Sequence, residues 1–192
     1  MMKRLQRAQG FTFVEMLITG TIVTSVTALA AFWLAGASEL WSLSTVQGDV
    51  RLRAQQTVNR VVDELRSATR TAAASPPNAS VPAVPNNTSV TFYLPADLDH
   101  NGLITDANGN TEWDTLTPIQ YAYVAAQGQL VRNAGAQQRI IATDVSGVTF
   151  ADRTINATLN TNEIQIALTL QRATARGRAV SSTATEIVKL RN

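Results

Sequence analysis

The sequence predicts an α+β fold in which one long N-terminal helix, with its first half in a membrane, packs against an antiparallel β-sheet head. Three observations support this prediction. An uncharged run covers residues 16–38, apolar residues then recur every three or four positions as far as residue 72, and from residue 90 the apolar period changes to two. The first two patterns indicate helix, and the third indicates strands.

The uncharged run is long enough to cross a bilayer. Its 23 residues would extend roughly 35 Å as a helix, against a hydrocarbon core of about 30 Å. The basic residues Lys3, Arg4 and Arg7 precede the run, and positive residues stay on the cytoplasmic side. We therefore expect a single inner-membrane span, with everything after Ser38 outside the cytoplasm.

One acidic residue, Glu15, lies just before this run. A carboxylate at that depth costs several kcal/mol unless it finds a partner, so it either has a function or marks the headgroup level. The small residues Ala35-Gly36-Ala37 offer a competing signal-peptidase site, and cleavage there would release a soluble protein that begins near Ser38. The length of the run favours retention as an anchor.

The segment Gly10-Phe11-Thr12-Phe13-Val14-Glu15, with its basic leader and apolar tail, resembles the N-terminal signal of type IV pilins and type II secretion pseudopilins. The resemblance implies that a prepilin peptidase cuts between Gly10 and Phe11 and methylates the new Phe11 amine. It also implies an assembly salt bridge from Glu15 to the Phe11 ammonium of a neighbouring subunit. Two paired charges are tolerated in an apolar core where one is not.

Behind the span, we expect the helix to continue as an amphipathic segment to near Ala74, about 60 residues from Phe11. Gly20, Gly36 and Gly48 weaken it. Prolines from residue 76 onward end it. The predicted parts are a leader at 1–10, a membrane and polymerisation half at 11–38, an amphipathic half at 39–74, and a head at 75–192 that begins with an αβ-loop at 75–89.

The head is predicted to be one meander-like antiparallel sheet, with a hairpin turn at Ala126-Gln127-Gly128. The phrases Thr91-Phe92-Tyr93-Leu94, Ile119-Gln120-Tyr121 and Gln129-Leu130-Val131-Arg132-Asn133 are similar to W-type minor pilins and J-type pseudopilins. The Thr- and Ser-rich span, with Phe32 where major pilins often carry proline, favours a minor subunit. The expected strands are Val90–Leu94, Ile119–Ala125, Gln129–Asn133, Arg139–Thr143, Val148–Ala151, Glu163–Gln171 and Thr185–Leu190.

One loop of the head matches the first half of a calcium-binding loop. Oxygen-bearing residues stand at positions 1, 3 and 5 with glycine at position 6, but position 12 is Asn108 instead of glutamate, and Pro95 precludes an entering helix. A solvated turn is the alternative, because Asp, Asn and Gly are common in turns. The candidate ligands of Ca²⁺ are Asp97, Asp99, Asn101, Leu103, Asp106, Asn108 and Glu112.

Charge and composition exclude several functions. Removing the leader's three basic residues leaves 13 basic against 14 acidic side chains, so general nucleic-acid binding is not favoured. Basic residues do gather near the C-terminus, where they indicate a solvated face, a contact with the next subunit or, less strongly, DNA contact during uptake. The chain has no cysteine, one histidine, no nucleophile elbow and no phosphate loop, so we expect no enzymatic activity.

Taken together, the residues and the resemblance predict a minor pilin or pseudopilin subunit at or near the tip of a type IV pilus or a type II secretion pseudopilus. Its expected partners are other subunits, the prepilin peptidase and the inner membrane. The alternative is a membrane-anchored or secreted calcium-binding recognition module outside any filament. The sequence does not choose between pilus, secretion and DNA-uptake machines.

Overall fold

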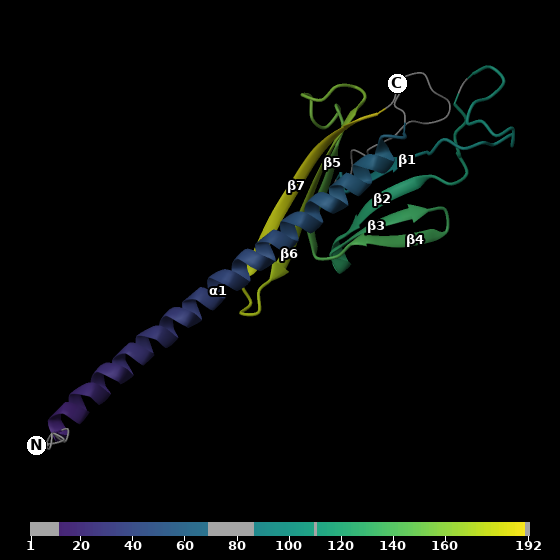
Figure 1. Ribbon diagram of the computed structural model, residues 1–192. Coiled ribbons are helices and arrows are strands. Elements are labelled where there is room, and N and C mark those ends of the chain that lie inside the picture. The colour runs from purple at the N-terminus through teal and green to yellow at the C-terminus, as the bar shows by residue number, and fades with distance from the viewer. Residues whose placement is uncertain (1–11, 69–86, 110, 191–192) are drawn as a thin grey trace, which may run out of the picture. The chain divides into compact units, whose positions relative to one another are not determined.

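A computed structural model describes residues 12–68, 87–109 and 111–190 of the protein (Figure 1). The chain divides into two units, Met1–Ser44 and Thr45–Asn192, and each is described by itself. The predicted leader, including Gly10 and Phe11, and most of the predicted αβ-loop lie outside the described residues. The described part has one long apolar helix and antiparallel strands, which confirms the α+β class.

Helix α1 covers Phe13–Leu65. By length and composition, it is the one helix among the described residues that could cross a membrane, and none of its apolar window is buried. The part of α1 that belongs to the first unit, from Phe13 to Ser44, exposes large apolar side chains, and its threonine hydroxyls donate to carbonyls of the same helix. These back-bonds are Thr19 to Glu15, Thr21 to Leu17, Thr24 to Gly20 and Thr27 to Val23, all at 2.7–2.8 Å.

The helix is shorter than predicted, because it ends at Leu65 and not near Ala74. After Arg66 the backbone bonding changes from four residues to three, as Ser67 donates to the Glu64 carbonyl and Ala68 to the Leu65 carbonyl. The Ser67 hydroxyl also donates to the Glu64 carbonyl at 2.6 Å. A serine side chain that competes for a helix carbonyl favours an end to the helix.

The strands form two sheets and not the single sheet that the sequence predicts. One sheet has the order β1-β2-β3-β4, with β1 at Ser89–Phe92, β2 at Ile119–Val124, β3 at Gln129–Ala134 and β4 at Gln137–Ala142. The other has the order β5-β6-β7, with β5 at Val145–Ala151, β6 at Glu163–Ala173 and β7 at Ala179–Lys189. Every pairing is antiparallel.

The link between β4 and β5 explains the split. It is only two residues long, and Asp144 has a φ of 60°, a left-handed conformation that redirects the chain. As a result β5 pairs with β6 instead of continuing the meander beside β4. The sheets remain bonded at their ends, where the Val145 amide donates to the Gly128 carbonyl and the Phe150 amide to the Asn87 carbonyl.

The core of the Thr45–Asn192 unit lies between the second half of α1 and the two sheets (Figure 1). In β6 the alternate residues Ile164, Ile166, Leu168 and Leu170 are all buried, as the period of two in this segment indicates. The rings of Phe92 and Tyr121 stack at 6.2 Å between centroids. The helix contributes Val50, Ala54, Val58, Val61, Val62 and Leu65 to this core.

Candidate functional site

The first candidate site is the start of α1, where Thr12 and Glu15 form a capping box. The Glu15 carboxylate accepts the Thr12 amide at 2.9 Å and the Thr12 hydroxyl at 3.0 Å, both through Oε2. In return the Glu15 amide donates to the Thr12 hydroxyl oxygen at 3.3 Å. The reciprocal bonds satisfy helix-end donors and hold the carboxylate in one orientation.

The capping box leaves one oxygen of the Glu15 carboxylate able to accept a further hydrogen bond or ion pair. An ionised carboxylate offers about four acceptor positions, and among the described residues Oε1 receives no donor. Glu15 is also the only charged residue of α1 before Glu39. Neither of the two roles expected for Glu15, ion partner or marker of the headgroup level, includes this capping, although the Thr12-x-x-Glu15 spacing is itself a capping signature.

The second candidate site is the acidic loop, which we define as residues 97–114. One carboxylate oxygen from each of Asp97, Asp99 and Glu112 lies within 4.8 Å of the other two. Oxygens around one Ca²⁺ at 2.3–2.6 Å are separated by no more than about 5 Å, so these three carboxylates fit a shared calcium ion. The structure thus brings together three of the seven predicted ligands.

The backbone of the loop turns around Asp97. Its Oδ1 accepts the Asn101 amide at 3.1 Å and its Oδ2 accepts the Gly102 amide at 2.8 Å, while Gly102 has a φ of 85°. Partial desolvation raises the pKa of Asp97, but these amide hydrogen bonds outweigh it and the pKa lies below its ordinary value. Asp97 is therefore ionised at neutral pH.

The remaining predicted ligands make other contacts. Asn101 donates its side-chain amide to Asp99 at 2.8 Å and accepts the Leu103 amide at 2.7 Å. Asp106 accepts the Asn108 amide at 2.8 Å in a separate turn, and it is not among the three converging carboxylates. The bridge between Thr105 and Thr111 closes that turn and brings Glu112 back to the start of the loop.

We expect calcium to raise the melting temperature of the purified full-length protein in detergent and chelated buffer. An ion at a hundredfold excess over its dissociation constant adds about 2.7 kcal/mol to the free energy of unfolding. Thermal unfolding with excess calcium measures the shift, and magnesium at equal ionic strength is the control. Asp97→Asn should remove the effect, and an unchanged melting temperature in the unmodified protein would exclude the calcium site.

A third polar cluster, around Glu64, is not among the sites that the sequence predicts. The Glu64 carboxylate accepts Arg132 Nε at 2.9 and 3.0 Å, a second nitrogen of Arg132, and the Tyr121 hydroxyl. Burial raises the pKa of Glu64, but the hydrogen bonds from Arg132 and Tyr121 and the nearby charges of Arg132 and Arg60 have a larger, opposite effect. The pKa of Glu64 therefore lies below its ordinary value. Burial and the Glu64 hydrogen bond raise the pKa of Tyr121.

This cluster joins the last turn of α1 to strands β2 and β3, and a lighter contact joins α1 to the other sheet. Asp49 accepts Arg172 of β6 at 3.0 Å and Arg53 of its own helix at 2.9 Å, and all three side chains are at least one-third exposed. In the sequence, the signal for the first cluster is a charged residue, Glu64, beside the apolar positions of the helix that become buried. Spacing does not pair Glu64 with Arg132, because 68 residues separate them.

Comparison with protein-family models, curated proteins and solved structures finds no match for this chain.

Proposed function

We propose that the chain is a structural minor subunit of a type IV pilus or a type II secretion pseudopilus. In this proposal a prepilin peptidase cuts between Gly10 and Phe11, and the processed protein is anchored in the inner membrane with its head outside the cytoplasm. It then enters the filament at or near the tip. The observation that carries the proposal is that one continuous helix has two halves built for two different surroundings.

The two halves differ in what covers them. From Val50 to Leu65 the helix buries a stripe of apolar residues in the core of its own unit. In the first half Phe32 is 80% exposed and Trp33 is 76% exposed, and apolar side chains are exposed on every face. Such a surface must be covered by lipid or by other apolar helices. A filament subunit would be covered first by lipid in the membrane and then by the helices of other subunits in the filament.

Packing between helices is supported by the small residues of the first half. A Cβ added at Gly20 or Gly36 would meet nothing within 4 Å, and a shallow apolar depression lies at Gly20 beside Met16 and Val23. Small residues of this kind let neighbouring helix backbones approach closely in apolar surroundings. Of the two glycines, Gly20 lies within two helical turns of Glu15 and supplies room for a second subunit near that carboxylate.

The charge of Glu15 supports the same proposal. A carboxylate held by a capping box in an apolar segment still requires a cation nearby. Cleavage after Gly10 would create one at the Phe11 amine, four residues before Glu15 in the chain. Pairing across subunits rather than within one chain would set the register of neighbouring helices.

A second function is favoured by the three converging carboxylates of the acidic loop. In that alternative the chain is a membrane-anchored or secreted calcium-binding recognition module that never enters a filament. The mature N-terminus distinguishes the two functions, because only the filament subunit requires processing after Gly10.

We expect mass spectrometry of the protein from its native membranes to find a chain that begins at an N-methylated Phe11. A Gly10→Val variant is the matched control and should retain its leader, since the bulky side chain blocks the small site that the peptidase requires. A chain that begins at Met1 or near Ser38 would contradict the filament proposal and leave the recognition module as the better explanation.

A further inference from the structure

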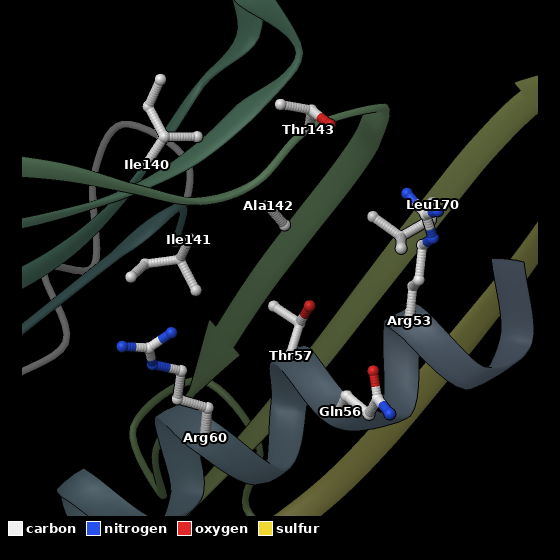
Figure 2. Close-up of a pocket in the computed structure, with 9 residues that line it drawn as sticks. All are labelled: Arg53, Gln56, Thr57, Arg60, Ile140, Ile141, Ala142, Thr143 and Leu170. Atoms are coloured by element: carbon white, nitrogen blue, oxygen red, sulfur yellow. The ribbon is translucent and has the colours of Figure 1, made fainter. Parts of the chain in front are cut away.

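A groove of about 520 Å³ lies between the second half of α1 and the edge strand β4, within the Thr45–Asn192 unit (Figure 2). Arg53 and Arg60 stand on its helix side, about 10 Å apart along the axis. Figure 2 shows Arg60 extending toward Ile141 and Arg53 extending toward Leu170. The groove therefore has a mixed lining, with apolar side chains from β4 and β6, polar side chains from α1, and a guanidinium at each end.

The positive charge of the groove is only partly matched by its surroundings. Asp49 is shared between Arg53 and Arg172, so one carboxylate serves two guanidinium groups. The carboxylate whose pKa is lowered by Arg60 is that of Glu64, and it is already paired with Arg132. Strand β4 pairs with β3 on one side only, and Ile140 on β4 is 53% exposed. An acidic segment with apolar side chains would match both the positive charge of the groove and the exposed apolar surface of β4.

The acidic loop has that chemistry. It contains five acidic residues and no lysine or arginine, and three of its carboxylates converge within 4.8 Å. The loop also exposes large apolar side chains, with Leu98 53% exposed and Leu103 61% exposed. Neither Arg53 nor Arg60 forms an ion pair with this loop in the same chain, within the ranges that the structure covers. Both surfaces are therefore available to a second molecule.

We propose that the acidic loop of one copy of this protein docks into the Arg53/Arg60 groove of another copy. The contact joins two different surfaces, so in a docked pair one copy keeps its groove free and the other keeps its acidic loop free. This inference rests on the proposed filament function and identifies a contact between heads. Residues 69–86 of the chain are a poorer match, because they contain no acidic residue and carry Arg70.

The docking depends on the membrane anchor. Exposed ion pairs contribute little one at a time, and the apolar contact area of the loop is small. Anchored heads are held at a high effective concentration, which turns a weak contact into an occupied one without new interactions. The proposal is therefore tested with the full-length chain in its native membranes, where neighbouring heads are present.

The chain has no cysteine, so introduced cysteines report cleanly on the contact. One tagged chain carries Gln56→Cys at the groove, and a second, differently tagged chain carries Ala107→Cys in the acidic loop. Both positions are exposed, and neither replaces a charged residue. Membranes from cells that express both chains are treated with a short bismaleimide in chelating buffer, so that no divalent cation competes for the carboxylates. Ser181→Cys on strand β7 replaces Gln56→Cys as the matched control.

We expect a cross-linked product that carries both tags from the 56 and 107 pair and none from the 181 and 107 pair. Arg60→Gln should remove the product, while Arg51→Gln on the same helix outside the groove should keep it. Equal yields from the two pairs, or a groove cysteine that captures only a different protein, would overturn the proposal. The N-terminus of the same sample separates the two ideas: a processed chain without the cross-link refutes the docking alone, and an unprocessed chain refutes the filament function.

Discussion

Replacing Glu15 with glutamine is expected to leave the protein in the membrane and to remove it from the filament. Glutamine at this position keeps the hydrogen bond to the Thr12 amide, so the capping box survives. It has no negative charge, so the neighbour's Phe11 ammonium would stay unpaired in an apolar interior at a cost of several kcal/mol. Each 1.4 kcal/mol corresponds to about a tenfold change in occupancy. Immunoblots of the membrane and sheared-filament fractions measure both quantities.

Thr12→Ala is the matched control for this prediction. It removes the hydroxyl half of the capping box at about 1 kcal/mol and leaves the Glu15 charge in place. We expect this variant to enter filaments nearly as well as the unmodified chain. If Thr12→Ala and Glu15→Gln exchange their expected behaviour, Glu15 acts as a helix cap and not as the ion partner of a neighbouring subunit.

The largest loss of stability from a single charged residue is expected at Arg132. Arg132→Met leaves the Glu64 carboxylate, which is 22% exposed, without its principal donor. A partly buried carboxylate without its partner costs about 2–4 kcal/mol of the free energy of unfolding. The corresponding fall in melting temperature is about 5–15 °C for a chain of this size. Thermal unfolding of the full-length protein followed by near-ultraviolet circular dichroism measures it.

Arg172→Met is the control, because the Asp49–Arg172 pair is exposed and should contribute less than about 1 kcal/mol. Acid provides a second measurement of the Arg132 prediction. The pKa of Glu64 is lowered in the folded protein, so its stabilisation is present above the ordinary value of about 4.5 and is lost as the pH falls through the folded value. Arg132→Met should weaken this acid dependence. Equal effects of the two substitutions would show that the cluster has no special role in stability.

The parts of the fold that depend on local sequence were predicted well. The alternation of β6 placed Ile164, Ile166, Leu168 and Leu170 on the buried face, and Gly128 with a φ of 59° ends the short turn between β2 and β3. The division into two sheets was not predicted. It depends on the left-handed backbone of Asp144, a conformation that aspartate adopts more often than most residues but that its presence in a sequence does not require.

The candidate sites also differ in whether they depend on local sequence or on contacts between distant parts of the chain. Asp97 and Asp99 belong to one turn, so their convergence could be read from spacing, and the return of Glu112 needed only a short bridged loop. The Glu64–Arg132 contact could not be read in this way, because its partners meet only after the helix packs on the first sheet. The groove beside β4 also exists only once β4 becomes an edge strand.

The threonine hydroxyls in the first half of α1 can donate their hydrogens in two different surroundings. Thr19, Thr21, Thr24 and Thr27 donate these hydrogens to carbonyls of their own helix, which would satisfy them in lipid. Beside another protein helix, the same hydroxyls can rotate and donate to that helix. The proposed filament function would require this exchange, because the segment would leave the bilayer for a fibre without leaving a hydroxyl unbonded.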